Sequence, residues 1–128
     1  KVELLTSRGR SDGPVPIKGL GCAAVPLRFM EYLLEETMEV VALYGPGVRV
    51  RVPDPARYAV HKLIVTQLRA AHSPKRPKDL LQARELFAAL RAREPESLEN
   101  AIENARSRGA TWRRIVDAGL ALLDEPAR

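Results

Sequence analysis

The stretch VRVRVPDPARYAVHKLIVTQLRAA, residues 48–71, changes its hydrophobic period at Pro53-Asp54-Pro55. Before that point, valines alternate with arginines, which is the period-two pattern of a strand with one apolar and one basic face. After it, apolar residues recur at helical spacing, at Val60, Leu63, Ile64, Leu68 and Ala71. Asp is favoured as a helix N-cap and Pro in the first helical position. The stretch therefore predicts a strand followed at once by a helix that runs to about Ala71.

The residues before this stretch predict further strands and one helix. A hairpin is expected where two β-branched runs flank YGPG, residues 44–47. The segment SRGRSDGPVPIKGLG, residues 7–21, is rich in Gly, Pro and charge and predicts a loop. A helix is predicted from about Pro26 to Glu36, with the proline in its first turn.

The chain opens with KVELLT, in which Val2, Leu4 and Thr6 alternate with Glu3 and Leu5 as in a strand. A strand at the first residue, with no partner before it, favours a fragment whose upstream part is absent. A boundary set by expression or proteolysis is the equally weighted alternative. If the first strands of the sheet are missing, the edge at residues 2–6 is exposed, and we expect homo-oligomers to form through it.

After the helix that ends near Ala71, the apolar spacing predicts three more helices. One runs from near Pro77 to about Arg93, a second follows Pro95 and ends at Gly109, and a third is capped by Thr111. Short linkers favour antiparallel packing. We therefore expect an α+β fold, with a partial sheet and hairpin in residues 1–53 and a domain of about four helices in residues 54–128.

Composition narrows the classes of partner and site. A net charge of +5 and a pI of about 9.8 favour anionic partners such as nucleotides or nucleic acid. The single Cys22 excludes an internal disulfide, suits a reducing compartment such as the cytoplasm, and is expected to be a small core residue. One Cys and two His do not supply a zinc site of the usual kind. No apolar run is long enough to span a membrane.

The segment RAAHSPKRPKD, residues 69–79, concentrates positive charge before its final carboxylate, Asp79. Its basic residues, with Lys62 on the preceding helix, form either a solvated surface or a site for an anion. Asp79, expected in the first turn of its helix, either caps that turn and pairs with Lys62 or Lys78, or orients a phosphate-binding lysine. His61, next to Lys62, is expected to be structural, and Trp112 is expected to pack the last helix.

The order and spacing of several blocks resemble a known family. These blocks are VELLT followed by RGRSD, then VPDPARYAVHKLIVTQLR, KRPKDLLQARELFAAL and RGATWRRI, and they cover most of the chain. They look like the C-terminal part of bacterial nucleotidyltransferase-fold proteins, related to DNA polymerase beta-like transferases and to abortive-infection toxins of that superfamily. The resemblance implies that Lys62, Lys78 and Asp79 matter for activity. It also implies a nucleoside triphosphate as substrate and leaves the acceptor open, with RNA and protein as the candidates.

In that superfamily, three carboxylates on a small sheet hold two Mg²⁺ ions. Glu3 matches the third carboxylate, where the family pattern more often has Asp. The Gly-Ser turn and Asp-x-Asp-like pair that supply the other two are not in this sequence. The resemblance therefore implies that this polypeptide alone lacks the machinery for transfer. Arg8 and Arg10, just after the first strand, either contact phosphate oxygens or belong to a solvated loop.

Two functions from different classes remain open at this point. The first is an enzyme fragment whose parent transfers a nucleotidyl group from a nucleoside triphosphate. The second is a non-catalytic basic helical module that binds nucleic acid or a partner protein, related to a toxin–antitoxin pair.

Overall fold

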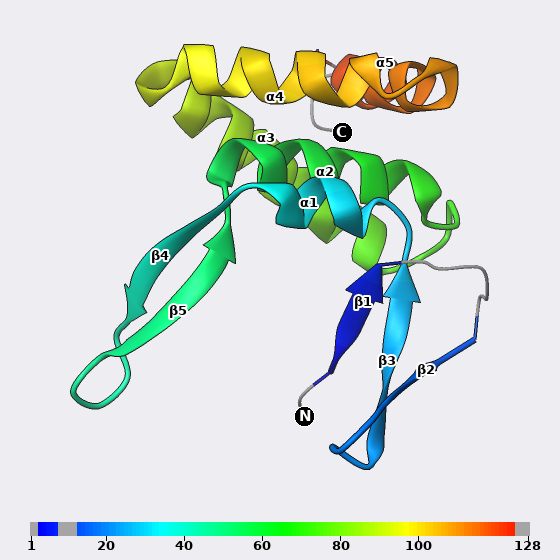
Figure 1. Ribbon diagram of the computed structural model, residues 1–128. Helices are drawn as coiled ribbons and strands as arrows, with labels where there is room; N and C mark the ends of the chain where they lie inside the picture. The colour runs from blue at the N-terminus through cyan, green and yellow to red at the C-terminus, as the bar shows by residue number, and fades with distance from the viewer. Residues whose placement is uncertain (1–2, 8–12, 125–128) are drawn as a thin grey trace.

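The computed structural model describes residues 3–7 and 13–124 and has the α+β architecture that the sequence predicts (Figure 1). Its strands are β1 (Leu5–Ser7), β2 (Val15–Ile17), β3 (Cys22–Leu27), β4 (Thr37–Ala42) and β5 (Val48–Pro53). Its helices are α1 (Met30–Glu35), α2 (Pro55–Leu68), α3 (Lys75–Arg93), α4 (Pro95–Ser107) and α5 (Ala110–Asp124). The strands extend to one side of α1, α2 and α3, and α4 and α5 cover the other side (Figure 1). None of the described helices is long and apolar enough to cross a membrane.

The change of period at Asp54 marks the end of a hairpin and the start of α2. Strands β4 and β5 pair antiparallel, and the next helix begins at Pro55. The Asp54 carboxylate accepts a hydrogen bond from the backbone N–H of Arg57 at 3.0 Å, which confirms the predicted cap. The backbone N–H of Asp54 donates to the carbonyl of Glu36 at 3.0 Å and so closes the base of the hairpin.

Arg57 joins α1, the hairpin and α2. Its side chain is buried, although Arg is rarely buried unless it is paired. The guanidinium donates to the carbonyl of Tyr32 and to the carboxylate of Glu35, both at 3.0 Å, and to the carboxylate of Glu36 at 2.5 Å. Because these three acceptors all lie on or next to α1, Arg57 fixes the end of α1 against the start of α2.

The other strands form a small mixed sheet in the order β1-β3-β2. Strand β1 runs parallel to β3, with Leu5 opposite Val25, and β2 runs antiparallel to β3, with Val15 opposite Ala24. Strand β1 is therefore an edge of this sheet, and no strand in the described part of the chain pairs with its outer side.

The prediction of a helix from Pro26 is wrong at its start. Residues 22–27 form β3, and α1 begins only at Met30, after Phe29 in the left-handed region at φ 66°. Pairing with β1 and β2 overrides the local helical pattern. Pro26 has no backbone N–H to donate to a neighbouring strand. It is tolerated because β2 pairs only with residues 22–24, so no hydrogen bond from residue 26 to β2 is needed. Cys22, predicted to lie in the core, is exposed at the start of the same strand.

Two helix starts also differ from the prediction. Helix α3 begins at Lys75, so Pro77 lies inside its first turn, where backbone N–H groups have no partner within the helix. Helix α5 begins at Ala110, which places Thr111 within the first turn and not at the cap. The carbonyl of Gly109 accepts the hydrogen bond from the backbone N–H of Arg113 at 3.0 Å.

The core lies around α2, which packs against α1, α3, α4 and α5. Helix α1 also contributes to it. Tyr32 is fully buried and donates its hydroxyl hydrogen to the carbonyl of Ala101 in α4 at 2.8 Å. Phe29 meets Trp112 edge-on, with ring centroids 4.5 Å apart, which confirms the packing role of Trp112. Residues before Asp54 thus share one core with the later helices, and the domain boundary at residue 53 stays a prediction.

Helix α5 approaches α2 most closely at Gly119. A Cβ atom at this position would lie 2.6 Å from Cγ of Leu63, which is fully buried. We expect Gly119→Ala to lower the free energy of unfolding by about 1–3 kcal/mol through overpacking, although alanine has the higher helix propensity. Urea unfolding measures the change.

The double variant Leu63→Ala/Gly119→Ala is the control, because it removes the atoms that the new methyl group would meet. We expect Gly119→Ala to be less harmful in that background than in the wild type, a coupling that a double-mutant cycle measures. A Gly119→Ala protein more stable than the wild type would contradict the close approach.

Candidate functional site

The carboxylate of Asp79, on α3, is shared by two cations from α2 and its C-terminal end. Lys62 Nζ lies 3.0 Å from Oδ1, and the Arg69 guanidinium donates through Nε to Oδ2. Asp79 is only 5% exposed, and the side chain of Lys62 is 20% exposed. The structure thus brings together Lys62 and Asp79, as predicted, and adds Arg69.

Helix α3 starts at Lys75, two residues before the predicted start near Pro77, and this explains why Lys62 and Asp79 meet. Lys62 lies six residues before the last residue of α2, and Asp79 lies four residues after the first residue of α3. At 1.5 Å per residue these are depths of about 9 Å and 6 Å from the connecting turn, a difference that a lysine side chain spans. Asp79 is therefore beyond the first turn of α3, and the prediction that it lies in that turn is wrong. Its charge is stabilised by the ion pairs with Lys62 and Arg69, and not by the helix dipole as the sequence predicts.

The partners of Asp79 keep it ionised. Burial alone would raise the pKa of this carboxyl group. Hydrogen bonds from Lys62 and Arg69, together with their positive charges, outweigh burial, and the pKa is lowered from its ordinary value. Asp79 therefore stays a carboxylate at neutral pH and can hold the Arg69 side chain in place.

Arg69 also faces a cavity of about 570 Å³ between the mixed sheet and the helices. Glu3 and residues of β1 and β3 line it, together with Arg69 and Lys75 from the segment that connects α2 to α3 and the start of α3. Lys62 does not line this cavity, and it reaches the cavity only through Asp79 and Arg69. The arrangement places two cationic side chains and Glu3 around one space that is large enough for a small molecule.

The other residues that the sequence analysis singled out, Lys78, Arg8 and Arg10, are not among the described residues that line this cavity. Lys78 is exposed on α3 one residue before Asp79. Arg8 and Arg10 lie outside the described residues. Arg69 and Lys75 were seen only as members of a basic run. The sequence contains a signal that could have singled out Arg69 from this run. Arg69 follows Lys62 by seven residues, which is about two helical turns and places both side chains on the same face.

The described carboxylates do not form a metal centre of their own. Residues 3–7 and 13–124 hold no group of three or more His, Cys, Asp or Glu side chains with the spacing that a metal ion needs. Among the described residues that line the 570 Å³ cavity, Glu3 is the one carboxylate. Mg²⁺ is commonly held by one or two carboxylates together with substrate phosphates. Glu3 therefore fits as a single protein ligand to a metal ion that a substrate carries.

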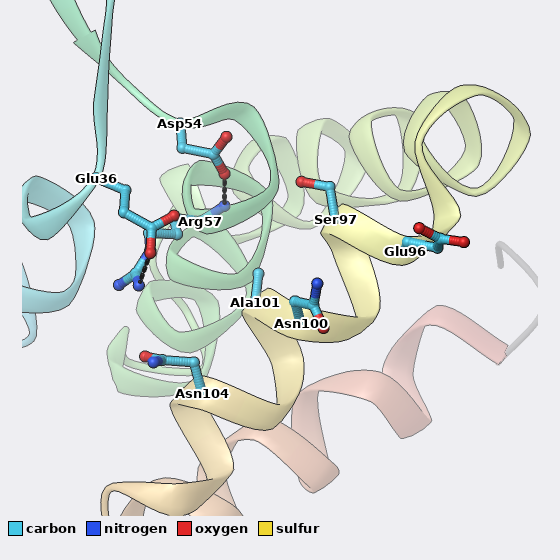
Figure 2. A pocket seen from close by; sticks show the side chains of 8 residues that line it. All are labelled: Glu36, Asp54, Arg57, Glu96, Ser97, Asn100, Ala101 and Asn104. Carbon is cyan, nitrogen blue, oxygen red and sulfur yellow. Dashed lines mark hydrogen bonds and ion pairs between the residues drawn. The ribbon is translucent and has the colours of Figure 1, made fainter.

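A second cavity, of about 430 Å³, lies between α4 and the start of α2 (Figure 2). Carboxylates of Glu36, Asp54 and Glu96 line it, together with the amides of Asn100 and Asn104. Its arginine, Arg57, is already bound to Glu36, as Figure 2 shows. Because its free charge is negative, this cavity is less suited to an anion than the 570 Å³ cavity that Arg69 and Lys75 line, which is therefore the candidate site.

The lowered pKa of Asp79 makes a prediction about acid unfolding. A carboxyl group whose folded pKa is below its unfolded value, about 3.9 for Asp, stabilises the fold fully above that value and loses the effect as the pH falls through the folded pKa. We expect wild-type stability to fall below about pH 4, and Asp79→Asn to lose stability at pH 7 and to depend less on pH in that range.

Urea unfolding of both proteins at pH 7 and pH 3 measures this difference. Asp117→Asn is the control, because Asp117 pairs with Arg106 at the exposed surface between α4 and α5. Equal pH dependence of Asp79→Asn and wild type would contradict the role of the shared carboxylate.

Comparison with known proteins completes the description of this site. A family model described as nucleotidyltransferase matches residues 1–107, which include Glu3, Lys62, Arg69, Lys75 and Asp79. Searches of curated proteins and of solved structures found no match. The family match agrees with the resemblance seen in the blocks of the sequence, and the chain therefore belongs to the nucleotidyltransferase family.

Proposed function

We propose that this chain provides the triphosphate-binding side of a site that transfers a nucleotidyl group from a nucleoside triphosphate to an acceptor. The observation that carries the proposal is the Asp79 carboxylate, which binds Arg69 at the edge of a cavity that Lys75 and Glu3 also line. Family membership supports nucleotidyl transfer in general.

The charges of this cavity suit a polyphosphate. Arg69 and Lys75 supply positive charge on one side, and a guanidinium and an ammonium bind phosphate oxygens in complementary ways. Lys62 then acts as a positioning residue, because it holds Asp79 and Asp79 holds Arg69. We propose that Lys78, Arg8 and Arg10 add contacts to the same anion from its periphery.

A Mg²⁺ ion bound to the triphosphate would neutralise part of its charge and stabilise the leaving pyrophosphate. Glu3 is the residue of this chain that we propose as its ligand. The sequence contains no Gly-Ser turn followed by an Asp-x-Asp-like pair that would supply the other two carboxylates. We therefore propose that this polypeptide alone is inactive and corresponds to the C-terminal part of the functional unit. The acceptor is proposed to be RNA or protein, and the cytoplasm is proposed as the compartment.

Strand β1 offers a route to assembly. It is an edge strand of the mixed sheet, and Leu4 and Leu5 are partly exposed there. We propose that two copies associate through this edge, because an exposed strand edge presents backbone donors and acceptors to a further strand.

The proposal predicts which variants lose triphosphate binding. Arg69→Ala and Lys75→Ala should each weaken the affinity for Mg²⁺-ATP by about tenfold, because a hydrogen bond to a charged group is worth about 1.5–3 kcal/mol. Lys62→Ala should weaken binding through the displacement of Arg69. Isothermal titration calorimetry measures the affinities.

The matched control is Arg93→Ala, which removes an exposed cation from the far end of α3. Its affinity for Mg²⁺-ATP should equal that of the wild type, and thermal unfolding should show that all variants are folded. The alternative function is a non-catalytic basic module, related to a toxin–antitoxin pair, that binds nucleic acid or a partner protein; the +5 net charge supports the binding of nucleic acid. It would be favoured if single-stranded RNA or a partner protein bound tightly and Mg²⁺-ATP did not bind at all.

A further inference from the structure

The ammonium group of Lys62 has a second contact besides Asp79. Its Nζ lies 3.0 Å from Asp79 Oδ1 and 5.5 Å from the centroid of the Tyr58 ring. Tyr58 precedes Lys62 by four residues on α2, so the two side chains lie on the same face of the helix. A lysine ammonium within about 6 Å of an aromatic ring is attracted by the negative face of the π-system. Lys62 is therefore held by a carboxylate and by an aromatic ring.

A lysine side chain needs more than one contact to keep a single position. Its ammonium is a compact charge at the end of a flexible four-carbon stem, with three donors that rotate freely. In the described part of the chain, the Asp79 carboxylate is its one ion-pair partner and the Tyr58 ring its one aromatic partner. One carboxylate oxygen leaves the stem free to swing, and the ring restricts that movement.

The Tyr58 ring is itself placed by the packing of α2 against α3. Tyr58 lines a groove of about 310 Å³ between these helices, together with Gln82, Glu85, Leu86 and Ala89 of α3. The residue is 37% exposed, and its hydroxyl has no hydrogen-bond partner in residues 3–7 and 13–124. The ring, and not the hydroxyl, therefore makes the contact with Lys62.

We propose that Tyr58 is a positioning residue for the candidate phosphate site, because its ring keeps Lys62 on Asp79 and thereby leaves Arg69 free to face the cavity. This inference rests on the proposed function, since it concerns the affinity of that site for a triphosphate. Tyr58 contacts Lys62, Lys62 donates to Asp79 Oδ1, and Arg69 donates to Asp79 Oδ2.

The physical link is competition for one carboxylate. Asp79 is 5% exposed, so its charge depends on the two cations that contact it. If Lys62 moves away, Arg69 is the one remaining cation, and the carboxylate attracts it more strongly. A guanidinium drawn onto Asp79 is less available to the phosphate oxygens of a ligand in the 570 Å³ cavity.

The first measurement is the affinity for Mg²⁺-ATP, by isothermal titration calorimetry on the full chain. We expect Tyr58→Leu to weaken binding about two- to fivefold, the range for a cation–π contact at a partly exposed site. Tyr58→Phe should bind as the wild type does, because phenylalanine keeps the ring and loses only the hydroxyl. This rescue by the conservative variant distinguishes positioning of Lys62 from a general need for tyrosine.

The second measurement needs no ligand and follows the carboxyl group of Asp79 by NMR titration. Lys62 and Arg69 are the charged groups that contact Asp79 and lower its pKa. We expect Tyr58→Leu to raise the pKa of Asp79 toward its ordinary value, because Lys62 then contacts the carboxylate for less of the time. Tyr58→Phe should leave this pKa unchanged.

Tyr44→Leu is the matched control, because Tyr44 is 81% exposed in the turn between β4 and β5. It should change neither the affinity nor the pKa of Asp79. Tyr58→Leu should also have no further effect on affinity in a Lys62→Met background, which keeps the stem and removes the charge. Tyr58→Gln replaces Tyr58→Leu if the latter does not fold, because glutamine favours a helix and has no ring.

The outcomes separate this inference from the function on which it rests. If the wild type binds Mg²⁺-ATP and Tyr58→Leu binds it equally well, the positioning role is wrong and the triphosphate site stands. The same holds if Tyr58→Phe is weakened as much as Tyr58→Leu, if the pKa of Asp79 does not rise in Tyr58→Leu, or if the loss persists in the Lys62→Met background. If the wild type does not bind Mg²⁺-ATP, both proposals are wrong.

Discussion

The sharing of one buried carboxylate, that of Asp79, between Lys62 and Arg69 is the interaction on which the candidate site depends. A carboxylate in this environment would be costly if it were unpaired, because burial disfavours its charge. Two cations from α2 and its C-terminal end remove that cost and at the same time fix the spacing of α2 and α3. The position of Arg69 at the cavity is a consequence of this arrangement.

Helix α2 is held by charge at both ends and by packing along its length. At its start, Arg57 binds the carbonyl of Tyr32 and two carboxylates at the end of α1. At its other end, Arg69 binds Asp79. Between them, Leu63 packs so closely against Gly119 that α5 has no room for a methyl group there. Helix α2 is therefore constrained at both ends and along its length, and Arg69 lies directly at its C-terminal end. Rigid elements position a site better than loops do.

The two groups of strands differ in how they join the helices and in what they contribute to the site. The mixed sheet contributes the apolar wall of the site, and Glu3 lies just before its strand β1, whereas the β4–β5 hairpin extends away from the helices (Figure 1). The hairpin joins the framework at its base, where Glu36 binds Arg57 and the backbone N–H of Asp54 donates to the carbonyl of Glu36. Polar contacts at this base, between α1 and α2, thus link the hairpin to the helical core.

The sequence by itself determined the change from strand to helix at Asp54, since an N-cap, a following proline and a new hydrophobic period are all local signals. It also indicated that Lys62 and Asp79 were candidates, because the resemblance of its blocks to the nucleotidyltransferase family implies that both matter for activity. The basic run of residues 69–78 was visible too, but its charges could not be ranked, since solvated and functional cations look alike in a sequence.

Three features were decided only by the tertiary structure: the strand at residues 22–27, the start of α3 and the surroundings of His61. Residues 22–27 became a strand because β1 and β2 pair with them, and such long-range pairing leaves no local signal. The start of α3 at Lys75 decided that Asp79 reaches Lys62 and Arg69, because a shift of two residues moves a side chain by about 3 Å along the axis and turns it to another face. That His61 Nε2 is buried with no hydrogen-bond partner in residues 3–7 and 13–124 likewise depends on what packs around it, which spacing along the chain does not encode.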